Sequence, residues 1–141
     1  GADCVVDSRS DDLGAEVLEA AGGAVDLVLE MAGGKSFDQL LGTLAPFGRM
    51  VVVGIATREQ NEVRTGKLLR NSFSVAGFWL MHLLARPDLA RDSIDRVFGA
   101  AARGEIKAVA GGTYGLSEAR QVHHDIAGRK TVGKLLLDPT R

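Results

Sequence analysis

Cysteine, aromatic residues, long apolar runs and an excess of one charge are all scarce in this sequence. The single cysteine, Cys4, allows no disulfide within the chain, so a reducing cytosol is the simplest setting. We also expect no signal peptide at the start of the chain, and a cytoplasmic protein. With 17 basic and 18 acidic residues, the net charge of −1 offers no field to attract nucleic acid or an anionic membrane. The longest apolar runs, such as the one at residues 51–53, are far shorter than the roughly 20 residues of a membrane-spanning helix.

Glycine is abundant instead, with 18 residues lying between short apolar segments. The chain of 141 residues is about one domain long, and its 45% hydrophobic content is enough for a packed core. We expect strands at residues 4–7, 25–31, 49–55, 73–79, 108–116 and 132–138. We expect helices at residues 11–21, 36–45, 64–71, 87–103 and 117–127.

Strands that alternate with helices are typical of βαβ units, which build a parallel sheet covered on both faces. The segments VDLVL and MVVVG are continuously apolar, as buried parallel strands are. Ser36 and Ser117 are expected to cap helices and Pro46 to end one. The helix at 87–103 should bury a stripe made of Ile94, Val97, Phe98 and Ala101. The predicted fold class is therefore α/β, with a Rossmann-like doubly wound parallel sheet.

In open α/β sheets, ligands bind beyond the carboxyl ends of the strands. Here these ends are residues 30–34, 54–57 and 78–80, and the first two contain glycines that let backbone amides approach a ligand. The alternative is that these glycines only form tight turns.

Two phosphate-binding motifs are absent. A P-loop through Gly34-Lys35-Ser36 would need glycine where the chain has Leu29, so the match fails. No G-x-G-x-x-G fingerprint is present either. This absence means either that the chain binds no dinucleotide or that the first βαβ unit is not in it.

The remaining candidate residues carry weak signals. Cys4 is best explained as a small core residue, His123 as a half-buried packing residue, and Trp79 as a core or interface residue. His82 lies alone near a strand end. Because no cluster has the spacing of zinc ligands and no nucleophile elbow occurs, we expect no metal site and can name no catalytic residue.

Several stretches, taken together, resemble the medium-chain dehydrogenase/reductase superfamily. GADCVVDSR at residues 1–9 resembles the segment that closes the first half of the cofactor domain. AVDLVLEMAGGKSFDQLLGTLAPFGRMVVVGIA at 24–56 resembles the fourth strand, the next helix and the fifth strand, including a P-x-G-R turn. KLLRN at 67–71, followed by FSVAGFWL, is similar to the zinc-independent quinone reductase branch. Gly104-Glu105-Ile106 and GRKTVGKLLLD at 128–138 resemble the family's close, so the resemblance covers nearly the whole chain.

The resemblance implies a cofactor site and a partner. Residues that would contact a nicotinamide cofactor, NADPH or alternatively NADH, are Gly54, Ile55, Ala56, Thr57, Phe78, Trp79, Leu80 and Arg129. The first four would line the nicotinamide side, the backbone of the next three would meet the carboxamide, and Arg129 would approach the adenosine phosphate. The strand at 73–79, from Phe73 to Trp79, would be the sheet edge and pair with a second copy in a homodimer.

The resemblance also implies an incomplete domain, since the family's first βαβ unit and its catalytic domain have no counterpart here. Residues 1–141 would be a partial dinucleotide-binding domain, with a core at 1–104 and a segment at 105–141 that normally joins the catalytic domain. Residues 4–7 should then pair directly with residues 25–31, or be displaced or swapped, and the two last strands may pair with each other or lie loose.

The implied function is part of an oxidoreductase that transfers a hydride from NAD(P)H to a quinone, enone or carbonyl compound. The chain alone should be inactive. The alternative is a Rossmann-like module for ligand binding or dimerisation without catalysis.

Overall fold

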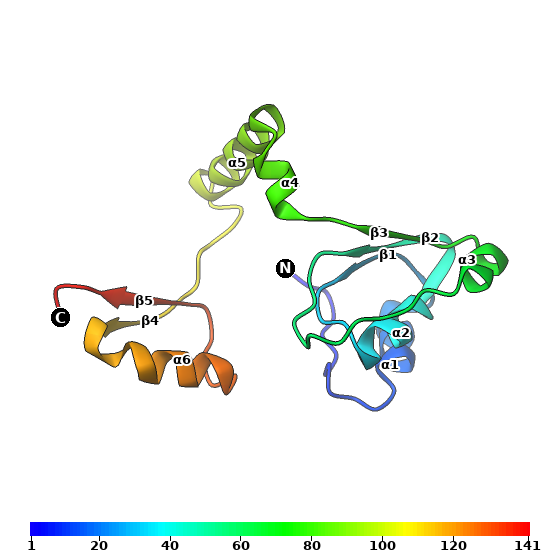
Figure 1. Cartoon of the computed structure of the whole chain (residues 1–141), viewed down its shortest axis with the longest axis horizontal. Helices are drawn as coiled ribbons and strands as arrows, with labels where there is room; N and C mark the ends of the chain where they lie inside the picture. Colours follow the sequence, from blue (N-terminus) through cyan, green and yellow to red (C-terminus); the bar gives the residue numbers. More distant parts are fainter. The chain divides into compact units, whose positions relative to one another are not determined.

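Helices and strands alternate along most of the chain, with α4 followed directly by α5 (Figure 1). The structure is a computed structural model that describes all residues from Gly1 to Arg141. It divides into two units, Gly1–Ala85 and Arg86–Arg141. The first unit contains α1 (Leu13–Ala21), β1 (Val25–Glu30), α2 (Lys35–Leu41), β2 (Leu44–Val52), α3 (Thr65–Asn71), β3 (Ser74–Gly77) and α4 (Leu80–Leu84). The second contains α5 (Pro87–Ala102), β4 (Ala110–Gly115), a 3-10 turn η1 (Leu116–Glu118), α6 (Ala119–Ala127) and β5 (Lys134–Asp138).

The three strands of the first unit form a parallel sheet in the order β1-β2-β3. Glu30 at the end of β1 pairs with Val52 of β2, and Val52 pairs with Gly77 at the end of β3. All three carboxyl ends therefore meet at one edge of the sheet, which confirms the predicted parallel arrangement. The strands are shorter at this edge than expected, since β2 ends at Val52 and β3 at Gly77.

The core of the first unit lies on one face of this sheet. Its buried residues are Phe37 and Leu41 of α2 together with Leu44 and Met50 of β2. On the other face Leu27 and Leu29 of β1 are exposed, because successive side chains of a strand point to opposite faces and no element of this unit packs there. The expectation of a sheet covered on both faces is therefore wrong for this unit taken by itself.

The segment between α2 and β2 also differs from expectation. The Ser36 side chain does not cap α2, because Gly34 is the cap residue and the Ser36 hydroxyl donates a hydrogen bond to the Gly33 carbonyl at 2.9 Å. The helix ends at Leu41 rather than at Pro46, which lies inside β2. Proline has no amide hydrogen to donate to a neighbouring strand. It is tolerated here because the β1–β2 register shifts between Val25 and Leu27, and at such an irregularity not every residue donates a hydrogen bond to the neighbouring strand.

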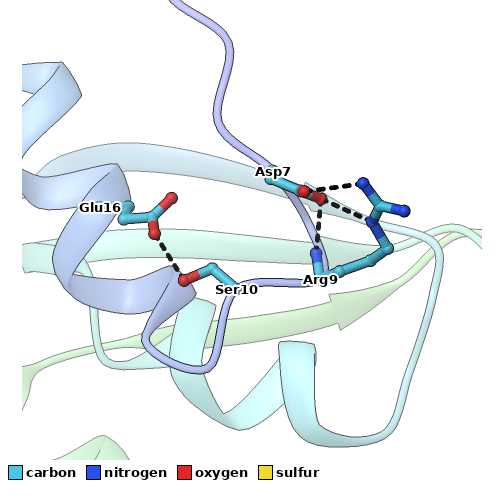
Figure 2. Close-up of polar contacts among 4 residues, drawn as sticks. All are labelled: Asp7, Arg9, Ser10 and Glu16. Carbon is cyan, nitrogen blue, oxygen red and sulfur yellow. Dashed lines mark hydrogen bonds and ion pairs between the residues drawn. The ribbon is translucent and has the colours of Figure 1, made fainter.

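The predicted strand at residues 4–7 does not form, and Cys4 is exposed. A strand needs a partner, and β1 is paired only with β2. The segment instead turns at Asp7, whose carboxylate accepts hydrogen bonds from the backbone and guanidinium of Arg9 (Figure 2). Ser10 then donates to Glu16 of α1 at 2.5 Å (Figure 2). Local side-chain contacts therefore shape the segment that leads into α1.

The second unit is a parallel β4–α6–β5 crossover preceded by α5. The prediction that its two strands may pair with each other is confirmed. The buried stripe on α5 is wrong, because Ile94, Val97 and Phe98 are exposed and nothing in this unit covers them. His123 is exposed too, rather than half-buried. Ser117 is not a helix cap, since it lies within η1, where the Gly115 amide donates to the Glu118 carboxylate instead.

Candidate functional site

The carboxyl ends of the three strands are joined beyond the strands themselves. The Val53 amide donates to the Glu30 carbonyl at 2.8 Å, and the Phe78 amide donates to the Val52 carbonyl at 2.9 Å. Each bond extends the pairing of two neighbouring strands by one residue. The loops that leave β1, β2 and β3 therefore start side by side, where open α/β sheets bind ligands.

The loops after β1 and β2 are fixed to each other by further hydrogen bonds. The amide and the hydroxyl of Thr57 both donate to the Ala32 carbonyl, at 2.9 and 2.7 Å. The Asn61 side chain bonds both the amide and the carbonyl of Gly34, each at 2.8 Å. These hydrogen bonds fix the backbone of the loop after β1 against that of the loop after β2.

The side chain of Glu30, at the end of β1, stabilises the loop that follows this strand. Its side chain is only 2% exposed, and its Oε1 accepts hydrogen bonds from the amides of Ala32 and Gly33, both at 2.8 Å. Its Oε2 is buried without a partner. From the sequence, Glu30 is placed only within the strand end at residues 30–34. The available signal was an acid at the end of an apolar strand that is followed, after Met31, by the small residues Ala32 and Gly33, whose amides need an acceptor.

Gly33 shows why this loop contains glycine. Its φ of +76° is a left-handed conformation, and an added Cβ would lie 2.5 Å from the Glu59 carbonyl oxygen and 3.2 Å from Cγ2 of Ile55. Any side chain at this position would therefore push the loop that contains Ile55 and Glu59. The glycines after β1 do more than make a turn, because one of them allows two loops to touch.

A cavity of about 520 Å³ lies over the ends of β2 and β3. Its lining residues come from the two strand ends, the loop after β2 and the start of α4: Val52, Val53, Gly54, Ile55, Gly77, Phe78, Trp79 and His82. All are apolar or glycine except His82, which is the only ionisable one. The first turn of α4 places this imidazole, since the His82 amide donates to the Trp79 carbonyl at 3.0 Å.

Four of the eight residues predicted for the site line this cavity together: Gly54, Ile55, Phe78 and Trp79. Ala56 and Thr57 lie next to it, where their amides bond the β1 loop, and Leu80 is the first residue of α4. Trp79 is 62% exposed and therefore no core residue of this unit. Arg129 belongs to the second unit, where it lies just after α6 with an exposed side chain and a φ of +54°, and its place in the site stays a prediction. Sequence reasoning missed Gly77 and dismissed His82, because the short helix α4 was not expected.

Neither a metal site nor a membrane span accompanies this cavity. No group of three or more His, Cys, Asp or Glu side chains is placed to hold a metal ion. None of the helices combines the length and the apolar character needed to cross a bilayer.

Comparison with known proteins agrees with this geometry. The chain is 27% identical over 141 residues to quinone oxidoreductase-like protein 2 homolog of Nematostella vectensis, covering 98% of this chain and 39% of that protein. It is 32% identical over 115 residues to bovine prostaglandin reductase-3, covering 75% of this chain and 30% of that protein. A mycobacterial protein solved in complex with NADPH superposes with a TM-score of 0.85 at 30% identity, covering 99% of this chain and 43% of the other.

These relatives are much longer than the sequence described, which spans about two fifths of the length of the first of them. The match to the zinc-binding dehydrogenase family extends over residues 1–137, nearly from end to end. The similarity to the medium-chain dehydrogenase/reductase proteins is thus confirmed, and the sheet is part of their Rossmann-type nucleotide-binding fold. The chain belongs to the zinc-binding dehydrogenase family.

Proposed function

We propose that this chain forms the nicotinamide side of the cofactor site in an NAD(P)H-dependent oxidoreductase. The observation that carries the proposal is the cavity over the carboxyl ends of β2 and β3, because this fold binds ligands beyond the carboxyl ends of its strands. NADPH is the first choice of cofactor, because a relative at 30% identity was solved with it, and NADH is the alternative.

The lining of the cavity fits a flat ring with one polar edge. Val53, Ile55, Phe78 and Trp79 offer apolar surface, while Gly54 and Gly77 let a ligand approach the backbone. These residues would orient the ring and exclude water from its reacting face. When bound, the cofactor supplies the hydride, and the protein supplies the position and the dry surroundings.

The same lining does not fit the phosphates of a dinucleotide. No lysine or arginine is among its residues, and the sequence contains no G-x-G-x-x-G loop to hold a pyrophosphate at a helix amino end. The chain alone should therefore bind the cofactor weakly and be inactive, whereas the full-length protein should bind it firmly. The substrate class we propose is an electrophilic quinone, enone or carbonyl compound, in keeping with the names of the relatives.

Filling the cavity tests this assignment in the full-length protein. Gly77 lines the cavity and an added Cβ there meets nothing within 4 Å, so Gly77→Leu should block the ring without disturbing the fold. Gly66 in α3 is equally open but lies outside the cavity, which makes Gly66→Leu a matched control. NADPH fluorescence titration should show at least about tenfold weaker binding for Gly77→Leu, equal to about 1.4 kcal/mol, and no change for Gly66→Leu. Equal binding by both variants would refute the assignment.

We also propose that the protein is a homodimer that pairs through β3. This strand is the edge of the sheet, with β2 on one side only, and an open edge needs cover. Light scattering of the full-length protein should give twice the mass of one chain. A monomer at micromolar concentration would contradict this proposal but leave the cofactor assignment untouched, since the cavity is built by one chain.

A further inference from the structure

His82 is a side chain in the cavity to which neither the sequence nor the proposed site assigns a role. It lies three residues after Trp79, the cap residue of α4, and both residues line the cavity. An apolar cavity with one ionisable side chain is a common arrangement at a site of proton transfer.

The surroundings of His82 single out this group as the source of a proton. The lining residues from β2 and its following loop are Val52, Val53, Gly54 and Ile55, and those from the end of β3 are Gly77, Phe78 and Trp79. None of them carries a charge or titrates. Within α4 the other residues are leucines and a methionine. The next charged residue along the chain, Arg86, is engaged by the Asp88 carboxylate at 3.1 and 2.8 Å.

Reduction by a nicotinamide leaves a proton to be supplied. A hydride brings two electrons and one hydrogen to the electrophile, and the product needs one further proton on the oxygen or carbon that becomes negative. An imidazolium can meet this need, because each of its two ring nitrogens carries a proton.

We propose, on the basis of the function proposed above, that His82 is the proton donor of the reduction. The Nε–H or Nδ–H bond of the imidazolium breaks as the new bond to the substrate forms. A bound nicotinamide would supply the hydride that balances this proton in a two-electron reduction, and the imidazole is left neutral. Because His82 is exposed at the rim of the cavity, solvent protonates it again before the next turnover.

The experiment uses the full-length protein with NADPH and 9,10-phenanthrenequinone, comparing wild type, His82→Gln and His123→Gln. His123 is an exposed histidine of α6 and serves as the matched control. We expect His82→Gln to lower kcat by about 100-fold while its dissociation constant for NADPH stays within a factor of two. The wild-type kcat should fall as pH rises, and this dependence should disappear in His82→Gln alone.

A second variant separates proton donation from a merely structural role. His82→Ala should regain part of its kcat when free imidazole is added, and the gain should follow the fraction of imidazolium. His82→Gln with wild-type kcat and pH profile, or with lost NADPH binding, would overturn the inference. If wild type itself neither binds NADPH nor oxidises it, the proposed function fails instead, so the two failures are distinguishable.

Discussion

The two units of the chain are stabilised in different ways. The first buries Phe37, Leu41, Leu44 and Met50 in one continuous core beneath its sheet. In the second, the only buried apolar residues are Ala90 and Val122, although α5 has an apolar stripe of ordinary length. The difference lies in what covers the apolar residues, because both units contain many of them.

The second unit depends on close backbone approach instead. An added Cβ at Gly111 of β4 would lie only 2.0 Å from the Val132 carbonyl oxygen, and one at Gly133 would lie 2.4 Å from that of Val109. Chains approach this closely only where a side chain is lacking. The comparison teaches that a parallel strand pair can form from backbone contacts while its apolar side chains remain available for another surface.

The largest expected effect is on the free energy of unfolding, and it should differ between the two units. Met50 is 0% exposed, so Met50→Ala should lower the free energy of unfolding by about 2–5 kcal/mol, through lost burial and the cavity left behind. Phe98 on α5 is 70% exposed, so Phe98→Ala in this chain should change it by less than about 0.5 kcal/mol. Urea unfolding followed by circular dichroism measures both.

The same pair tested in the full-length protein sharpens the comparison. If the stripe on α5 is covered there, Phe98→Ala should become costly while the effect of Met50→Ala stays the same. A large loss for Phe98→Ala already in the 141-residue chain would show that the second unit has a core of its own, and the comparison would be wrong.

The second effect concerns Glu30, whose carboxylate accepts two hydrogen bonds from the loop after β1. Glu30→Ala leaves the amides of Ala32 and Gly33 without their acceptor, which should cost about 2–3 kcal/mol. Glu30→Gln keeps an acceptor oxygen of the same reach and should cost less than about 1 kcal/mol. Thermal unfolding ranks the two variants. Equal losses would mean that the carboxylate itself matters rather than its two hydrogen bonds.

The third effect tests the backbone approach in the second unit. Gly111→Ala forces Val132 away and should weaken the β4–β5 pair by about 1–3 kcal/mol. Gly99→Ala is the control in the same unit, since there the Cβ meets only the flexible end of Arg103 and alanine favours the helix. Hydrogen exchange at residues 110–115 and 134–138 should speed up for Gly111→Ala alone, with no change in β2.

How far the sequence predicted this structure depends on whether a signal is local. Continuous apolar runs with glycine turns correctly predicted β1, β2, β3 and their parallel order, because burial and turn geometry depend on residues that are adjacent in the sequence. The strand at residues 4–7 failed because a strand needs a partner, and the stripe on α5 failed because a helix face needs a cover. Neither requirement is visible within the segment itself.

The candidate site was predictable to a similar extent. Gly54 and Phe78 followed from the rule that ligands meet strand ends, together with a family resemblance. Glu30 was not predicted, because it accepts hydrogen bonds from backbone amides, which belong to no sequence motif. His82 escaped because its place in the cavity depends on a single turn of helix, α4, with five residues and no cap signal in the sequence.

The smallest effect lies outside both cores, in ion pairs that each unit forms between residues two apart. A side-chain hydrogen bond from Arg9 lowers the pKa of Asp7 to about 2, and one from Arg86 lowers the pKa of Asp88. In the ordinary case an aspartate titrates near 3.8, so what Asp7 adds to stability is present above that pH and is lost as pH falls toward about 2. Both pairs are exposed, so the effect on stability should be slight and should weaken with salt.

NMR titration of the carboxyl groups checks this pair by pair. Arg9→Gln should raise the pKa of Asp7 toward its ordinary value and leave that of Asp88 unchanged, because each pair is local to its own turn. Met50→Ala should leave both values unchanged under conditions in which the protein is still folded, since neither pair touches the core. A shift of Asp7 in Met50→Ala would show that the segment before α1 depends on the core after all. In that case the first unit would be one cooperative body that includes its amino-terminal turn, and the contrast with the second unit would be greater still.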